Sequence, residues 1–198
     1  HIGGVPALLE RWPQLPVFAP DDDRIPAAYP RVGDGEAVEV AGWRFDVIAV
    51  PGHTRSHVAY FGHGLLFCGD TLFSLGCGRM FEGTPEQMHA SLSRLAALPP
   101  ETRVCCGHEY TLANAAFARV VEPGNPALQR RTEEAQAMRE SGHPTLPSTV
   151  ADERATNPFL RVDEPQVRSS LQRHLGRPML DSVEAFAELR RWKDGFTA

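Results

Sequence analysis

The sequence predicts an α/β fold with a strand-rich first part and a helical second part. Short apolar runs separated by Gly and Pro fill the first 110 residues, and a helix with clear ends lies between two of them. The strand pattern disappears after Tyr110. Because strand, helix and strand in succession form the unit of an α/β layer, we expect a sheet domain over 1–110 and a helical domain over 111–198.

The composition is that of a globular protein. Of its 198 residues, 42% are hydrophobic, which suffices for a sizeable core. A net charge of −5 argues against nucleic acid or an anionic membrane as a partner, and no apolar run approaches the roughly 20 residues that cross a bilayer. Four cysteines without CxxC spacing predict reduced thiols and a cytoplasmic location.

The strands are predicted from apolar runs bounded by turn residues. They cover 17–19, 38–40, 43–50, 58–61, 65–68 and 104–106. Gly62, His63 and Gly64 suit a hairpin loop, which makes His63 an exposed turn residue and not a ligand.

The helices are predicted from their caps. Thr84, Pro85 and Gln87 form a capping box that starts a helix, and Pro99 stops it. Three further helices are expected. One covers 111–121, the second starts at Asn125 and Pro126 and runs toward 142, and the third begins at Asp181, where Asp181 and Glu184 suit a second capping box, and ends near 195. The proline-rich stretch 143–158 predicts a long ordered connection or a segment that wraps over the surface.

Three glycine-flanked segments carry metal-type ligands at the ends of apolar runs. His53 follows Pro-Gly, whereas Asp70 and His108 each follow Cys-Gly. A strand gives such a ligand rigidity, and glycine lets the backbone turn. Imidazole and carboxylate groups suit zinc or a similar divalent ion. Structural histidines are common, so the residues alone leave a structural role open.

Longer motifs resemble the hydroxyacylglutathione hydrolases, the glyoxalase II branch of the metallo-β-lactamase superfamily. The segments are PGHT at 51–54, CGDTLF at 68–73, GCGR at 76–79, FEGT at 81–84, CGHEYT at 106–111, EPGN at 122–125 and NPFLR at 157–161. PGHT is shared across the superfamily, whereas GCGR, FEGT and CGHEYT are specific to this branch. The resemblance implies an αββα sandwich, partial over 1–110, followed by a helical substrate-binding domain.

The resemblance also implies a binuclear metal centre. His1 resembles the last histidine of the family's HxHxDH motif, so we expect a chain truncated at its N-terminus. The implied ligands are His53 for one ion, His1 and His108 for the other, and Asp70 as the bridge. Zinc is expected, with iron or manganese as alternatives. His57 is expected to support the ligands without binding metal.

The matching positions imply where glutathione binds. They are Arg79, Met80, Phe81, His108, Glu109, Tyr110, Arg190 and Lys193. Without the resemblance, Arg190 and Lys193 also fit simple compensation of a helix dipole. With it, their charges suit the carboxylates of glutathione.

The function implied is hydrolysis of an S-(2-hydroxyacyl)glutathione thioester such as S-lactoylglutathione, in methylglyoxal detoxification. Asp70 is expected to orient a metal-activated hydroxide. We expect a monomer. Two alternatives stay open. One is a mono-iron dioxygenase acting on glutathione persulfide, against which the long helical region 111–198 argues. The other is an inactive fragment that keeps only a glutathione pocket.

Overall fold

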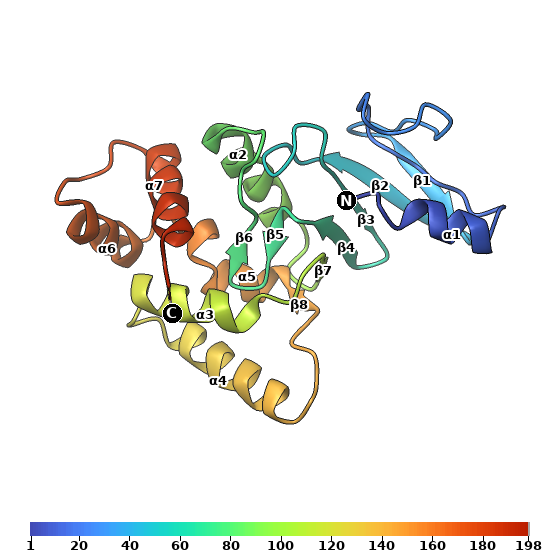
Figure 1. Cartoon of the computed structure of the whole chain (residues 1–198). Helices are drawn as coiled ribbons and strands as arrows, with labels where there is room; N and C mark the ends of the chain where they lie inside the picture. The colour runs from blue at the N-terminus through green and yellow to red at the C-terminus, as the bar shows by residue number, and fades with distance from the viewer. Residues whose placement is uncertain (198) are drawn as a thin grey trace.

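The computed structural model describes residues 1–197, which form a sheet and a group of helices beside it (Figure 1). The strands are β1 (Ala37–Val40), β2 (Trp43–Ala49), β3 (Val58–Gly62), β4 (Leu65–Gly69), β5 (Leu72–Phe73), β6 (Gly76–Cys77), β7 (Arg103–Cys106) and β8 (Ser148–Thr149). The helices are α1 (Val5–Arg11), α2 (Pro85–Ala96), α3 (Thr111–Val121), α4 (Pro126–Glu140), α5 (Val150–Thr156), α6 (Pro165–Leu175), α7 (Ser182–Asp194) and the 3-10 helix η1 (Pro158–Leu160). The α/β fold class is as predicted.

The main sheet has the strand order β1-β2-β3-β4-β7-β8. Its neighbours pair antiparallel, except β4 and β7, which are parallel and are connected through α2. Because β4 and β7 run in the same direction, the residues that follow them leave the sheet at the same edge. The short strands β5 and β6 form a separate hairpin directly after β4.

One hydrophobic cluster joins the sheet to helices from both parts of the chain. Leu66 on β4 and Val104 on β7 are fully buried in it, together with Met88 on α2 and Phe186 on α7. Burial of one such side chain contributes about 1.5–3 kcal/mol. The helical part therefore shares its core with the sheet, and the domain boundary at residue 110 stays a prediction.

The predicted helix caps are largely confirmed. The Thr84 side chain accepts a hydrogen bond from the Gln87 amide, and the Gln87 side chain accepts one from the Thr84 amide. At α7 only half of the expected box forms: Asp181 accepts from the Glu184 amide, but the Glu184 carboxylate binds Leu180 and Arg177 instead.

One expectation about local structure is wrong, and some elements were not predicted. Residues 17–19 form no strand, because Pro16 and Pro20 lack amide donors and Ala19 makes only a bridge to Arg31. The stretch 143–158 is ordered, and it contains β8 and α5, which were not predicted; Thr149 and Asp152 form a capping box at the start of α5. Helices α1 and α6 were likewise not predicted.

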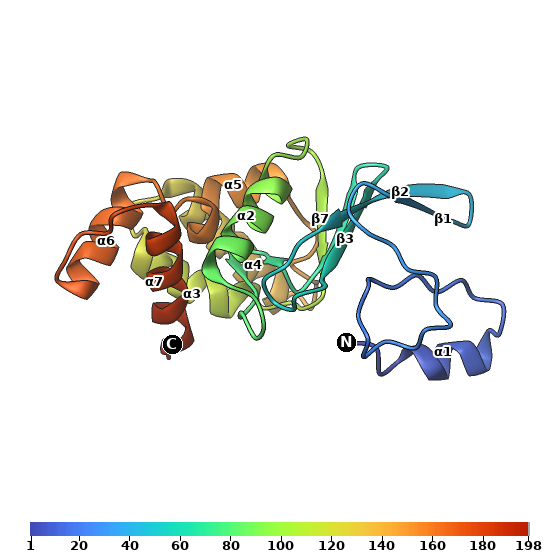
Figure 2. The ribbon, with the colours of Figure 1, turned by 90° about the horizontal axis from the view of Figure 1, so that it is seen from above.

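The N-terminal helix α1 lies apart from the helical layer. In the view of Figure 2 it is separated from α2 to α7 by the sheet, and none of its residues is buried. Among the helices described, none is both long and apolar enough to cross a membrane.

Candidate metal centre and substrate cavity

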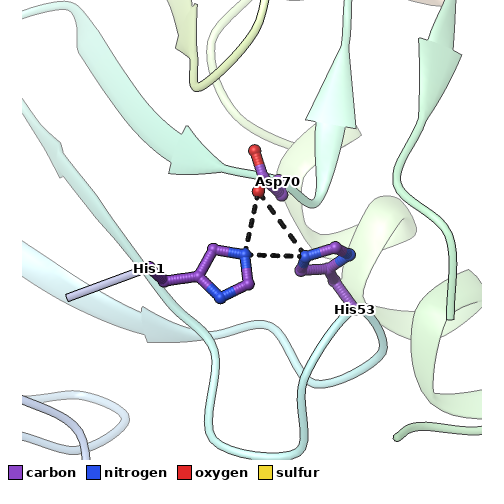
Figure 3. A group of neighbouring side chains, drawn as sticks. All are labelled: His1, His53 and Asp70. Carbon is purple, nitrogen blue, oxygen red and sulfur yellow. Dashed lines mark hydrogen bonds and ion pairs between the residues drawn. The ribbon is translucent and has the colours of Figure 1, made fainter. Parts of the chain in front are cut away.

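Four predicted metal ligands meet at one edge of the main sheet. His53 lies in the loop after β2, Asp70 directly follows β4, and His108 lies two residues beyond β7. His1 reaches them from the first residue of the chain. Figure 3 shows the rings of His1 and His53 and the Asp70 carboxylate pointing toward one another.

The Asp70 carboxylate faces donor atoms on both sides. Its Oδ2 is 3.1 Å from Nε2 of His1 and 3.5 Å from Nε2 of His53, and these two nitrogens are 3.0 Å apart. Its Oδ1 is 3.5 Å from Nε2 of His108. A carboxylate that faces two groups of donors is suited to bridging. The resemblance implies that His1 and His108 share an ion. In the structure the half-exposed His1 side chain instead turns toward His53.

This donor set fits a divalent cation. Tetrahedral ligands at about 2.0–2.2 Å from an ion place their donor atoms about 3.3 Å apart. The measured separations of 3.0–3.5 Å agree with that spacing. Nδ1 of His53 lies 2.8 Å from the Arg79 carbonyl oxygen and donates a hydrogen bond to it, which leaves Nε2 with a free lone pair.

The backbone around Asp70 requires glycine on two sides. A Cβ atom at Gly78 would lie 1.9 Å from the Asp70 carbonyl oxygen, and one at Gly107 would lie 2.5 Å from Oδ1. Gly69 has a φ of 50°, in the left-handed region that favours glycine. The glycines beside the ligands therefore allow close backbone approach.

His57 supports Asp70 from behind. Its Nε2 accepts a hydrogen bond of 3.2 Å from the Asp70 amide. Burial, reinforced by the nearby His53, lowers the pKa of His57, which suits a neutral acceptor. His57 therefore contacts the backbone of Asp70, and its role in supporting the metal ligands stays a prediction.

A cavity of about 510 Å³ opens beside the metal ligands. Its lining includes the predicted residues Arg79, Phe81, His108, Tyr110, Arg190 and Lys193, together with His1, His53, Asp70, Phe73, Cys77, Gly78, Ala113, Asn114, Asp194 and Phe196. The Tyr110 ring stacks on His108 with centroids 5.0 Å apart, and the Phe81 ring meets His53 edge-on at 5.1 Å. Metal ligands and predicted substrate contacts thus share one cavity.

Away from Asp70, three cations and the Asp194 carboxylate set the charge of this cavity. Asp194 lies 3.0 Å from Nη2 of Arg190 and 3.5 Å from Nε of Arg79. Lys193 donates to the Ala113 carbonyl, and burial, together with the charges of Arg190 and Arg79, lowers the pKa of Lys193. An anionic ligand is favoured here.

Two of the predicted substrate residues do not face the cavity. The Met80 side chain packs against the hydrophobic core, and the Glu109 carboxylate accepts hydrogen bonds from the amide and hydroxyl of Thr145. Some residues that line the cavity were not predicted. Asp194 directly follows Lys193, and Asn114 lies one helical turn after Tyr110, so spacing along the helices was a usable signal.

The fold and the donor set define a protein of the metallo-β-lactamase superfamily. The family model of that superfamily matches residues 1–108. Among solved structures, ETHE1 from Myxococcus xanthus aligns with a TM-score of 0.60 and 27% identity, covering 96% of this chain and 71% of that one. TTHA1623, solved in a di-iron-bound form, aligns with a TM-score of 0.54 and 27% identity over 81% of this chain and 72% of that one. Binding of divalent metal follows from this membership.

The C-terminal half narrows the assignment. The family model for the hydroxyacylglutathione hydrolase C-terminus matches residues 109–196. A hydroxyacylglutathione hydrolase from Xylella fastidiosa (strain M23) is 61% identical over 196 residues, which cover 99% of this chain and 76% of that protein. The chain belongs to the hydroxyacylglutathione hydrolase family, and the resemblance drawn from its motifs is confirmed. The C-terminal match favours this family over the dioxygenase alternative.

Proposed function

We propose that this chain hydrolyses the thioester of an S-(2-hydroxyacyl)glutathione, with S-lactoylglutathione as the expected substrate. The products are a hydroxy acid and glutathione, as methylglyoxal detoxification requires. One observation carries the proposal: the metal-type donors and a cation-rich lining belong to the same cavity.

The substrate half of the cavity suits glutathione because this tripeptide carries two carboxylates. The Arg79 side chain is 65% exposed and therefore accessible to a ligand. The Lys193 amine is partly buried against the rings of Phe117 and Phe196, which hold it in place. A guanidinium binds a carboxylate through two hydrogen bonds, and the ammonium group adds a point charge.

The reaction half of the cavity suits hydrolysis. His1, His53, Asp70 and His108 would hold two divalent ions, for which we propose zinc, with iron as the alternative because the related TTHA1623 is di-iron-bound. When bound, such ions lower the pKa of water from 15.7 toward about 7 and polarise a carbonyl. Asp70 and His53 keep their orientation through His57 and the Arg79 carbonyl. Because a thiolate leaves readily, the reaction needs no strong acid from the protein.

We further propose a monomer that acts in the cytoplasm. The proposed location is supported by the cysteines, which are free thiols, with Cys68 and Cys77 buried. Burial raises the pKa of Cys77 to about 11, which keeps this thiol protonated and unreactive.

The test is the Asp70→Ala variant, with Asp46→Ala, an exposed carboxylate on β2, as control. We expect Asp70→Ala to lose bound metal and S-lactoylglutathione hydrolysis together, and Asp46→Ala to keep both. Metal content after dialysis and the rate of thioester loss are the measurements. An Asp70→Ala variant with unchanged metal and turnover would contradict the proposal. A wild-type chain that binds glutathione without metal or turnover would instead support the inactive-fragment alternative.

A further inference from the structure

The segment between Asp70 and Arg79 is bound by side chains from the helical part of the chain. Each of the residues 73–77 has one backbone group in such a contact. Asn157 donates to the carbonyl oxygens of Phe73 and Gly76, Asn114 to that of Ser74 and Arg190 to that of Cys77, while Glu153 accepts from the Leu75 amide. The β5–β6 hairpin is therefore held by groups far away in the sequence.

Two of these side chains do not line the cavity. Glu153 on α5 and Asn157, which precedes η1, are both 0% exposed. Glu153 Oε2 accepts from the Leu75 amide at 2.8 Å and from Nδ2 of Asn157 at 3.0 Å. The same Nδ2 lies 2.9 Å from the Gly76 oxygen and 3.2 Å from that of Phe73.

These contacts fix a turn that the local backbone does not favour. Leu75 has a φ of 60°, a left-handed conformation that is costly for a residue with a branched side chain. Such a conformation persists where surrounding contacts determine it. The hydrogen bonds that Glu153 and Asn157 make around Leu75 hold it in this conformation.

The hairpin leads directly into the metal centre. The residue that follows β6 is Gly78, whose amide donates to the Thr71 carbonyl and whose α-carbon lies against the Asp70 backbone. The next residue, Arg79, offers the carbonyl oxygen that accepts from Nδ1 of His53. A displaced hairpin therefore shifts Asp70 and releases His53.

We propose that Glu153 and Asn157 are positioning residues for the metal centre: they hold the β5–β6 hairpin, and through it they orient Asp70 and His53. Their part in catalysis rests on the proposed hydrolysis, whereas their effect on metal affinity does not. Groups that orient metal ligands indirectly are typically worth about 10–100-fold in metal affinity or activity.

The informative variants remove the hairpin contacts and keep the local helix ends. Asn157→Ser keeps an oxygen that caps η1 at the Phe159 amide, but its short side chain no longer reaches the two carbonyl oxygens. Glu153→Leu removes the acceptor of the Leu75 amide. Glu153→Gln keeps an acceptor for the Leu75 amide. Because burial raises the pKa of Glu153, the neutral glutamine side chain also resembles the protonated carboxyl group.

The matched control is Asn125→Ala. Asn125 is an asparagine 8% exposed that caps α4 and contacts the Ala155 carbonyl, but it makes no contact with the hairpin among the hydrogen bonds of the described residues. Its loss tests whether general destabilisation of the helical part is enough to disturb the metal centre.

The measurements are metal affinity by competition with a chelator, amide hydrogen exchange at Leu75, and kcat and KM for S-lactoylglutathione. We expect Asn157→Ser and Glu153→Leu to lose about 10-fold or more in metal affinity, with faster exchange at Leu75 and a lower kcat. Glu153→Gln stays within about 3-fold of wild type, and Asn125→Ala keeps wild-type metal affinity.

Wild-type metal affinity and Leu75 exchange in Asn157→Ser would overturn the inference, as would an equal loss of metal affinity in Asn125→Ala. If Glu153→Leu fails to fold, Asn157→Ser and Glu153→Gln still decide the question. A wild-type chain without hydrolase activity contradicts the proposed function alone, since metal affinity and amide exchange test the positioning role separately.

Discussion

Substitution of Gly78 by alanine tests whether the backbone beside Asp70 sets the metal centre. The added Cβ would lie 1.9 Å from the Asp70 carbonyl oxygen, whereas ordinary contacts begin at 3.4 Å. The two groups must therefore separate by about 1.5 Å, while metal–ligand distances tolerate only about 0.2 Å. Gly78 has no left-handed φ, so the effect is steric and not conformational.

We expect Gly78→Ala to bind metal at least about 10-fold more weakly than wild type. Overpacking of this kind also costs about 1–3 kcal/mol of unfolding free energy. The assays are metal titration against a chelator and thermal unfolding of the metal-free protein. The control is Gly33→Ala, where the nearest atom to an added Cβ is a side-chain oxygen of Glu36 at 3.7 Å. There we expect unchanged metal affinity and stability equal to or slightly above wild type.

Wild-type metal affinity in a folded Gly78→Ala protein would refute this reasoning. That result would mean that the loop at 78–79 moves aside without disturbing Asp70, and that the close approach is incidental to the site. A loss of stability alone, with metal affinity unchanged, would lead to the same conclusion.

Two further predictions concern charge. Lys193→Met should raise KM about tenfold at nearly constant kcat, because it removes a charged contact to the bound substrate. The control Arg191→Met, on the outer side of α7, should change neither KM nor kcat, and steady-state kinetics measure both values. The pKa of Glu82 is lowered from 4.5 to about 2, mainly by its hydrogen bond with Arg24 and to a lesser extent by one from the Arg55 amide. Between pH 4.5 and 2 the unfolded state therefore binds more protons than the folded state. The contribution of Glu82 to the stability of the fold is present above pH 4.5 and is lost as the pH falls toward 2. Arg24→Met should flatten this acid-dependent fall in Tm at low salt, and identical pH profiles would contradict the assignment.

Elements whose signals are local were predicted well. The capping box at Thr84 and the start of α3 at Thr111 are set by neighbouring residues, and both lie where the sequence places them. The strand expected at 17–19 failed because a strand needs a partner with free donors and acceptors, which three apolar residues cannot specify. Helix α5 was missed because prolines at 147 and 158 obscured the box at Thr149.

The site was predictable where ligands follow strands. Asp70 and His108 follow two parallel neighbours, so their convergence needed only the correct sheet. The position of His1 beside His53 depends on how the N-terminal segment folds back, which no local pattern encodes. The burial of Arg190 against Cys77 depends on packing of α7 against a hairpin 113 residues earlier.

The hairpin couples the two halves of the cavity. Asp70 lies before it among the metal donors, and Arg79 lies after it among the substrate contacts. Arg190 is expected as a direct substrate contact, but its side chain is largely buried, with the residue 5% exposed. It donates one hydrogen bond to the Cys77 carbonyl on the hairpin and another to the Asp194 carboxylate. Substitution of Arg190 therefore removes a support of the metal centre along with a positive charge. Its effect should reach kcat as well as KM, unlike that of Lys193, because Arg190 donates to the Cys77 carbonyl on the hairpin whereas Lys193 donates to the Ala113 carbonyl on α3.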